Sequence, residues 1–215
     1  MPVEVKICGL STPETVDAAV EAGADLIGLV FFPKSPRNVT IPQGAQLASR
    51  ARGKAKVVAL EVDADDALLA EIARTVQPDL IQAHGGETPE RVAEIARLTG
   101  KPVIKAIRVK DDADIASAAQ FSEAASLILY DAKAPETLGS ALPGGNGHAF
   151  DWGLLEGEKR PAFMLAGGLT PANVAEAIRV TGAPVVDVSS GVESAPGVKD
   201  IGLIRKFIEA AKAAR

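Results

Sequence analysis

Two residues capable of acid–base or nucleophilic chemistry stand where short apolar runs end. Cys8 closes the run Val-Lys-Ile-Cys and is followed by a glycine, and Asp131 closes the run Ser-Leu-Ile-Leu-Tyr. A cysteine thiolate can act as a base or as a nucleophile. A partly buried carboxyl group keeps its proton to higher pH and can donate it near neutrality. Together, the two residue types suit proton transfer.

Each of these residues also has a purely structural explanation. Free cysteine is among the residue types most often buried in cores, and an aspartate at a strand end can simply cap the loop that follows it. The sequence leaves both explanations open for Cys8. It favours the functional one for Asp131, because a long Gly-rich loop follows that residue.

Two turns rich in small residues occur near the end of the chain. They are Ala166-Gly-Gly-Leu-Thr170 and Val188-Ser-Ser-Gly-Val-Glu193, and each one follows an apolar run. Small residues leave backbone N–H groups free to surround a phosphate at a helix N-terminus. One Gly-Gly turn is more often a plain tight turn, but two in succession predict a phosphate site at Gly167, Gly168, Ser190 and Gly191.

The chain alternates short aliphatic runs with longer Ala-, Glu- and Arg-rich stretches at helical spacing, a pattern typical of βα units with a parallel sheet. Strands are predicted over residues 3–8, 25–31, 56–62, 80–84, 102–107, 126–131, 162–166 and 185–188. Helices are predicted over residues 13–21, 43–51, 67–75, 89–98, 113–121, 171–180 and 201–214. Thr12, Thr88 and Thr170, each followed by a proline, are predicted N-caps.

Eight such units average about 27 residues each, the compact end of the α/β class of (β/α)8 TIM barrels. We expect residues 1–215 to form one such domain. A doubly wound open sheet is the alternative, but Cys8-Gly-Leu-Ser11 stands where a Gly-x-Gly-x-x-Gly turn would follow the first strand. The longest irregular connections, residues 32–42 and 132–149, follow the second and sixth strands, where we expect substrate contacts.

The barrel adds further candidate residues to Cys8 and Asp131. Reactive side chains of such barrels stand at the C-terminal ends of the strands, around one mouth. This rule brings the first two candidates together and adds Gln82, His84 and Asp187.

Arg37, in the loop after the second strand, could pair with a carboxylate, although surface arginines commonly only face solvent. His148, in the loop after the sixth strand, is expected to be a surface residue, and Phe150 and Trp152 are expected to anchor that loop into apolar surface. No second histidine or carboxylate stands at ligand spacing from His84, so no metal site is predicted.

Composition excludes several kinds of partner. The chain carries 28 acidic against 23 basic residues and has no basic block, so nucleic acid is not expected as a partner. No apolar run approaches the roughly 18 to 20 residues that cross a bilayer, so no membrane partner is expected. A single cysteine and a charged start point to a cytoplasmic protein. A monomer is the default, although the sequence does not distinguish it from a homodimer.

A series of motifs in this sequence resembles the motifs of the phosphoribosylanthranilate isomerases of tryptophan biosynthesis. The resemblance runs in order from residue 5 to about residue 210, and such a series is highly specific. The matching segments are Lys6-Ile-Cys-Gly-Leu10, Phe31-Phe-Pro-Lys-Ser-Pro-Arg37, Ile81-Gln-Ala-His-Gly85, Leu142-Pro-Gly-Gly-Asn-Gly147 with Phe150-Asp-Trp152, Leu165-Ala-Gly-Gly-Leu-Thr-Pro-Ala-Asn-Val174, and Val186-Asp-Val-Ser-Ser-Gly-Val-Glu193 with Pro196-Gly-Val-Lys-Asp200.

The resemblance implies a cofactor-free Amadori rearrangement of a phosphorylated small molecule, N-(5'-phosphoribosyl)anthranilate, to 1-(o-carboxyphenylamino)-1-deoxyribulose 5-phosphate. By matching motif, Cys8 would be the general base and Asp131 the general acid. Arg37 would hold the anthranilate carboxylate, and the two Gly-rich turns would hold the phosphate. Gln82 and His84, in the fourth-strand motif, would be further substrate contacts.

This chain departs from the family pattern at two positions. Ala83 stands where the family usually has leucine, and Asn146 where it usually has threonine. The first change concerns packing and the second concerns closure of the sixth loop. Neither touches the acid, the base or the phosphate turns.

Three other functions compete with this one. The histidine-pathway isomerase performs the same chemistry but resembles a two-aspartate design, whereas here the first strand ends in Cys8. A phosphate-binding transferase or synthase barrel is a second rival, but a transferase would need a metal-diphosphate site, and no acidic cluster could build one. The third is a barrel that only binds phosphate, and the presence of both Cys8 and Asp131 argues against it.

Overall fold

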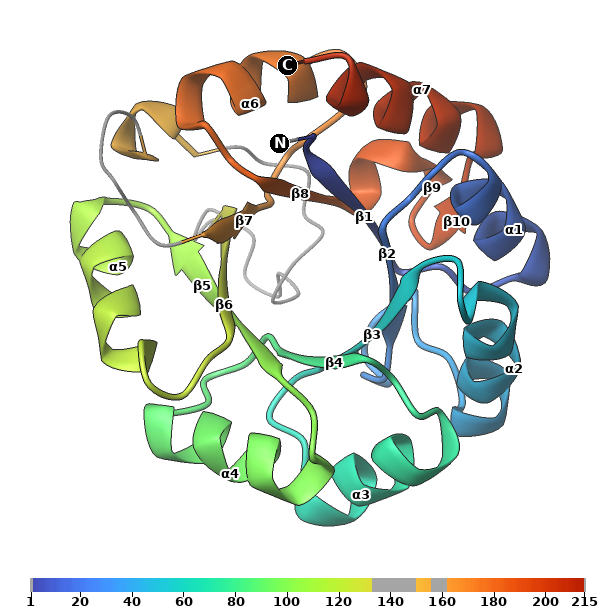
Figure 1. Ribbon diagram of the computed structural model, residues 1–215, viewed down its shortest axis with the longest axis vertical. Helices are drawn as coiled ribbons and strands as arrows, with labels where there is room; N and C mark the ends of the chain where they lie inside the picture. Colours follow the sequence, from blue (N-terminus) through green and yellow to red (C-terminus); the bar gives the residue numbers. More distant parts are fainter. Residues whose placement is uncertain (1, 133–149, 156–161, 215) are drawn as a thin grey trace.

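A closed barrel of eight parallel strands forms the centre of the molecule (Figure 1). The computed structural model describes residues 2–132, 150–155 and 162–214. Within these residues the strands follow one another around the ring in sequence order, and β1 closes the ring against β8. The predicted (β/α)8 TIM barrel is therefore confirmed, and the open doubly wound sheet is excluded.

The elements alternate along the chain as expected. The barrel strands are β1 (Glu4–Cys8), β2 (Leu26–Val30), β3 (Lys56–Glu61), β4 (Leu80–Ala83), β5 (Val103–Val109), β6 (Leu127–Ala132), β7 (Phe163–Leu165) and β8 (Val185–Val188). The helices are α1 (Pro13–Glu21), α2 (Ile41–Ala51), α3 (Asp66–Thr75), α4 (Pro89–Thr99), α5 (Asp112–Ser117), α6 (Val174–Thr181) and α7 (Ile201–Lys212). Short 3₁₀ helices are η1 (Ala118–Phe121), η2 (Trp152–Leu155) and η3 (Ser190–Val192), and β9 (Glu193–Ala195) pairs antiparallel with β10 (Val198–Lys199).

Two of the three predicted threonine caps are confirmed. The side chains of Thr12 and Thr88 accept hydrogen bonds from backbone N–H groups in the first turns of α1 and α4, and a proline opens each helix. Thr40 caps α2 in the same way and forms a reciprocal capping box with Gln43. Because of that box, α2 begins at Ile41, two residues before the predicted start.

The third cap prediction is wrong. Helix α6 begins at Val174 and not at Pro171, and the side chain of Asn173 folds back over the turn that precedes it. Its Oδ1 accepts from the Thr170 N–H at 2.7 Å, and its Nδ2 donates to the Gly168 carbonyl at 3.0 Å. The predicted helix over residues 113–121 is also shorter than expected, since it tightens to a 3₁₀ helix after Ser117.

The strands bury both of their faces, which explains their nearly continuous apolar character. On the outer face of β1, Val5 and Ile7 belong to the large core between the barrel and the helices. Inside the barrel a second apolar core contains Leu26, Val58, Ile104, Ala106, Leu129, Met164, Ala166 and Val185. Successive side chains of a strand alternate between these two environments. Alternation therefore decides which polar residues can reach the mouth.

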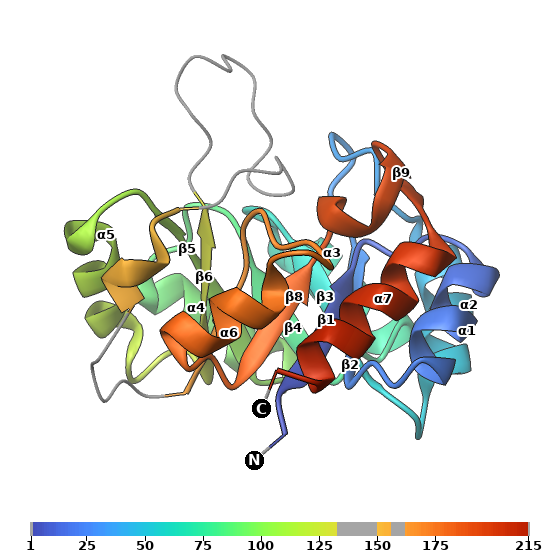
Figure 2. The ribbon, with the colours of Figure 1, turned by 90° about the horizontal axis from the view of Figure 1, so that it is seen from above.

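The mouth lies at the C-terminal ends of the strands, on the side away from the N-terminus, where the β9–β10 hairpin also stands (Figure 2). Residues 133–149 of the predicted connection after β6 lie outside the described residues. This range includes Asn146 and His148. Phe150 and Trp152, beyond that connection, pack against the main core, which confirms their predicted anchoring role.

Candidate active site

Cys8 ends β1 with its side chain inside the barrel. It is buried, and it packs with Val30 and Leu60. Gly28 is its neighbour in register on β2, and a Cβ atom at Gly28 would lie 2.8 Å from the Cys8 sulfur. Glycine at that position therefore makes room for the thiol at the mouth.

A charged pair lies on the same interior face, one layer below the thiol. The Lys6 Nζ donates to Asp187 Oδ1 at 3.0 Å, and the two residues are partners in the β1–β8 register. Burial raises the pKa of the Cys8 thiol, and the positive charge of Lys6 opposes that rise. Burial acts to lower the pKa of Lys6, but the charges of Asp187 and Cys8 outweigh it and raise that pKa.

Asp131 belongs to a chain of three buried polar side chains. His84 Nε2 lies 3.2 Å from Asp131 Oδ2, and Gln82 Nε2 lies 2.8 Å from His84 Nδ1. The amide nitrogen of Gln82 can only donate, so Nδ1 is the acceptor and the proton of the neutral ring is on Nε2. His84 therefore donates to the carboxyl group of Asp131 and fixes its orientation.

The two Gly-rich turns lie against each other at the ends of β7 and β8. Gly167 and Gly168 have φ of 85° and 63°, a conformation that favours glycine. A Cβ atom at Gly191 would collide with the carbonyl oxygen of Leu169, so the second turn can approach the first this closely only with glycine there. Ser190 and Gly191 open η3, and the first amides of a helix have no partner within it. This is the arrangement that binds phosphate in many such barrels.

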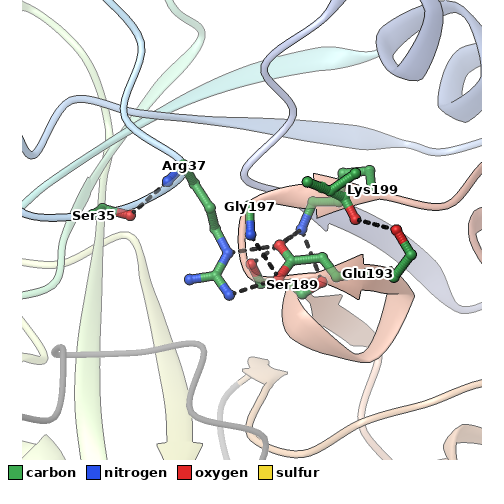
Figure 3. Close-up of polar contacts among 8 residues, drawn as sticks. Ser35, Arg37, Ser189, Glu193, Gly197 and Lys199 are labelled. Atoms are coloured by element: carbon green, nitrogen blue, oxygen red, sulfur yellow. Dashed lines mark hydrogen bonds and ion pairs between the residues drawn. The ribbon is translucent and has the colours of Figure 1, made fainter.

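Arg37 connects the loop after β2 to the β9–β10 hairpin (Figure 3). It is buried, and its Nε and Nη2 contact the two carboxylate oxygens of Glu193 at 2.7 and 2.9 Å. Lys199 Nζ lies 2.7 Å from the same carboxylate and donates to the Ser189 carbonyl at 2.8 Å. Burial acts to raise the pKa of Glu193, but Arg37 and Lys199 outweigh it and lower that pKa. The guanidinium group is thereby held in one orientation.

A third group of buried charges lies on the outer face of the barrel, beneath the helices. Lys105 Nζ contacts Glu87 Oε2 at 2.6 Å and donates to the Gly85 carbonyl at 2.9 Å. Glu61 is also buried there, and burial together with the charge of Glu87 raises the pKa of Glu61 to about 7. Lys105 occupies the face of β5 shared by Val103 and Ile107, which belong to the outer core. This group does not face the mouth.

The structure brings most of the predicted site residues to the expected place. Four of them, Cys8, Gln82, His84 and Asp131, are buried at interior positions near the ends of β1, β4 and β6. The roles predicted for these residues, for Arg37 and for the glycines of the two turns remain predictions.

Sequence reasoning missed three contributors. Lys6, Glu193 and Lys199 each lie within a motif but attracted no role. Lys6 carried a usable signal: it stands two residues before Cys8 in an apolar strand, so both side chains must share one face. Glu193 carried none, because its partner Arg37 is 156 residues away.

No group of three metal-ligating side chains occurs within residues 2–132, 150–155 and 162–214. In that same part of the chain, no helix is long and apolar enough to cross a membrane.

Comparison with known proteins decides the family. Residues 5–210 match the model of the family described as N-(5'phosphoribosyl)anthranilate (PRA) isomerase. The chain belongs to this family. It is 57% identical over 214 residues to the N-(5'-phosphoribosyl)anthranilate isomerase of Rhodopseudomonas palustris strain BisA53, covering 99% of this chain and 97% of the relative.

Solved structures of family members have the same fold. The phosphoribosyl anthranilate isomerase from Thermotoga maritima is 36% identical with a TM-score of 0.87, and 98% of each chain is covered. A second structure, 34% identical with a TM-score of 0.83 and 98% of each chain covered, is a phosphoribosyl anthranilate isomerase in complex with reduced 1-(o-carboxyphenylamino)-1-deoxyribulose 5-phosphate.

Proposed function

We propose that this PRA isomerase family member rearranges N-(5'-phosphoribosyl)anthranilate to 1-(o-carboxyphenylamino)-1-deoxyribulose 5-phosphate, with Asp131 as the acid and Cys8 as the base. The family match over residues 5–210 carries the reaction. The assignment of the two residues is supported by their place, since each lies at or next to the C-terminal end of its strand, is buried and faces the barrel interior. The reaction is an internal proton transfer and belongs to tryptophan biosynthesis.

Asp131 gives the first proton. Opening the furanose ring requires protonation of the ring oxygen as its bond to C1' breaks, and the nitrogen lone pair then forms a Schiff base. The bond from His84 Nε2 to Asp131 Oδ2 holds the carboxyl group in place for this step. Gln82 in turn holds the imidazole ring, so in this proposal Gln82 and His84 orient the acid as well as line the substrate site.

Cys8 takes the second proton. The Schiff base acidifies the proton on C2', and the thiolate removes it to leave an enolamine. The enolamine then tautomerises to the ketone as its C2' hydroxyl loses a proton and C1' gains one. Cys8 releases its proton to solvent and Asp131 takes one up, so both residues return to their starting states. Substrate and product have the same atoms, so the reaction needs no external oxidant or reductant, and we propose that it needs no cofactor or metal.

The remaining predicted residues would position the substrate. Arg37 would pair with the anthranilate carboxylate, as a rigid guanidinium group is suited to do. The amides of Gly167, Gly168, Ser190 and Gly191 would hold the phosphate. The substrate would then extend across the mouth, with its carboxylate at Arg37 and its phosphate at the two Gly-rich turns.

We further propose that residues 1–215 act as one domain, that the enzyme is monomeric and that it is cytoplasmic. The formal charge of −5 and the absence of a basic block support a protein without a nucleic-acid partner. Sedimentation at several protein concentrations measures the molar mass in solution. A value of 22.1 kDa is expected, and twice that value would show a homodimer.

A substrate comparison tests the reaction. The protein is given N-(5'-phosphoribosyl)anthranilate generated in situ and, separately, the phosphoribosyl substrate of the histidine-pathway isomerase. Turnover of the first, followed as loss of its fluorescence, is expected. Turnover of the second alone would assign the chain to the rival reaction, and binding of the product without turnover of either would make it a binding protein.

A further inference from the structure

Lys6 is an unusual residue for the inside of a barrel. Its side chain is fully buried, although a lysine is among the largest side chains and carries a charge. Moving an ammonium group out of water costs several kcal/mol, which a single ion pair only roughly repays. The 3.0 Å contact with Asp187 therefore makes the burial tolerable, but an apolar pair of similar size would be expected to stabilise the barrel as well. Stability alone does not explain this lysine.

The position of Lys6 suggests another role. Lys6 and Cys8 are two residues apart on β1 and share its interior face, so the ammonium lies directly below the thiol. The backbone on both sides is fixed by the neighbouring strands, since Lys6 pairs in register with Asp187 and Cys8 with Gly28. A thiol at this buried position can become a thiolate only if a positive charge compensates for the loss of water.

We propose that Lys6 is a positioning residue whose ammonium group, held in place by Asp187, is the counter-ion of the Cys8 thiolate. The inference rests on the proposed role of Cys8 as the base. In the rearrangement the thiolate accepts the C2' proton and becomes a neutral thiol, while Lys6 and Asp187 remain a paired cation and anion. When the proton leaves, the thiolate again faces the ammonium, so each turnover restores the same charges.

The charges around Cys8 determine in which direction each substitution should shift the pKa of its thiol. Burial raises the pKa of the thiol; the charge of Lys6 and, to a smaller extent, that of Lys199 lower it, whereas the charge of Asp187 raises it. The neighbours on β2 and β3, Gly28 and Leu60, are uncharged. Removing Lys6 and neutralising Asp187 must therefore move the titration of Cys8 in opposite directions. A pair that does not act on the thiol would leave its titration unchanged in both variants.

The experiment is a direct titration of the thiol. Cys8 is the chain's only cysteine, so thiolate absorbance in the ultraviolet and the rate of alkylation by iodoacetamide both report on it alone. In Lys6→Met the titration is expected to move upward by about one to three pH units, with alkylation near neutral pH at least about tenfold slower. In Asp187→Asn, where an amide oxygen can still accept from Lys6, it is expected to move downward.

Lys105→Met is the matched control, because it also removes a buried lysine from a carboxylate pair but on the outer face. It is expected to leave the Cys8 titration unchanged. An unchanged titration in Lys6→Met, or an upward shift in Asp187→Asn, would overturn the proposal. If Lys6→Met does not fold, Asp187→Asn decides alone.

These measurements do not require turnover, so they separate the inference from the proposed function. If the two variants shift the titration in opposite directions but the protein does not rearrange the substrate, the role of Lys6 as counter-ion stands and the proposed isomerase reaction is rejected. In an active protein, the acidic limb of the kcat profile against pH is expected to move upward in Lys6→Met together with the thiol titration. A profile that stays in place would contradict the link between Lys6 and the base.

Discussion

Two buried lysine–carboxylate pairs occupy opposite faces of the same barrel. Lys6 pairs with Asp187 at 3.0 Å inside it, and Lys105 pairs with Glu87 at 2.6 Å outside it. The inner pair lies below Cys8, whereas the outer pair ties the loop after β4 to β5 through the Gly85 carbonyl. The same two chemical groups therefore serve chemistry in one place and loop structure in the other.

Strand alternation creates this difference. Along β1, the side chains of Lys6 and Cys8 point into the barrel, and those of Val5 and Ile7 point towards the helices. Changes to the inner polar residues that act on the substrate should therefore reduce turnover, whereas changes to outer ones should reduce stability and leave turnover unchanged.

Replacing the inner acid should give the largest loss. Asp131→Asn keeps an oxygen that can accept from His84 but has no proton to give, so kcat should fall by about 10²- to 10⁴-fold. Steady-state kinetics measure the loss, and binding of a product analogue checks that the site is intact. A normal rate would assign the acid to another residue.

Breaking the outer pair should affect stability. Lys105→Met leaves Glu87 buried without its partner and should lower the free energy of unfolding by about 3–5 kcal/mol. Urea unfolding measures this change. The kcat of the folded variant should equal that of the wild type, and a large fall in kcat at unchanged stability would reverse the roles given to the two pairs.

A smaller effect concerns Glu61, which faces Glu87, Asp63 and Lys105. Its pKa is raised from 4.5 in the unfolded chain to about 7, so between these values the folded protein holds a proton that the unfolded chain releases. The stability from this proton is fully present below about pH 4.5 and is lost as the pH rises through about 7, up to about 3 kcal/mol in total.

The Glu61→Gln variant isolates that effect, because glutamine does not titrate. The difference in unfolding free energy between wild type and variant should change across this range, with the variant relatively more stable at about pH 8 than at about pH 5. A constant difference would mean that Glu61 titrates normally in the folded protein.

Removal of metal should have the smallest effect. No group of metal ligands is present in the described part of the chain, and the proposed proton transfers need none. Dialysis against EDTA should leave kcat unchanged. Inhibition that a divalent ion reverses would contradict the proposed mechanism.

Much of the fold followed from local patterns. Threonine before proline marked the starts of α1 and α4, and the alternation of runs marked eight strands. The same pattern failed at α6, where residues 171–173 form a turn and the helix begins only at Val174, with Asn173 as its N-cap. A cap motif alone does not specify the residue at which a helix begins.

The site was predictable only where position along a strand was enough. The rule that polar residues end barrel strands found Cys8, His84 and Asp131. It could not find that Arg37 is held by Glu193, since the hairpin that carries Glu193 is brought beside the loop after β2 only by closure of the barrel. Long-range pairs of this kind depend on register and loop path, which local sequence does not determine.

The most direct test of the account compares the wild type with Cys8→Ala in the rearrangement itself. N-(5'-phosphoribosyl)anthranilate is generated in situ, and its fluorescence is followed after each folded protein is added. We predict loss of fluorescence with the wild type and none above background with Cys8→Ala. Equal rates for both proteins would remove Cys8 as the base, and no loss with either would contradict the proposed reaction.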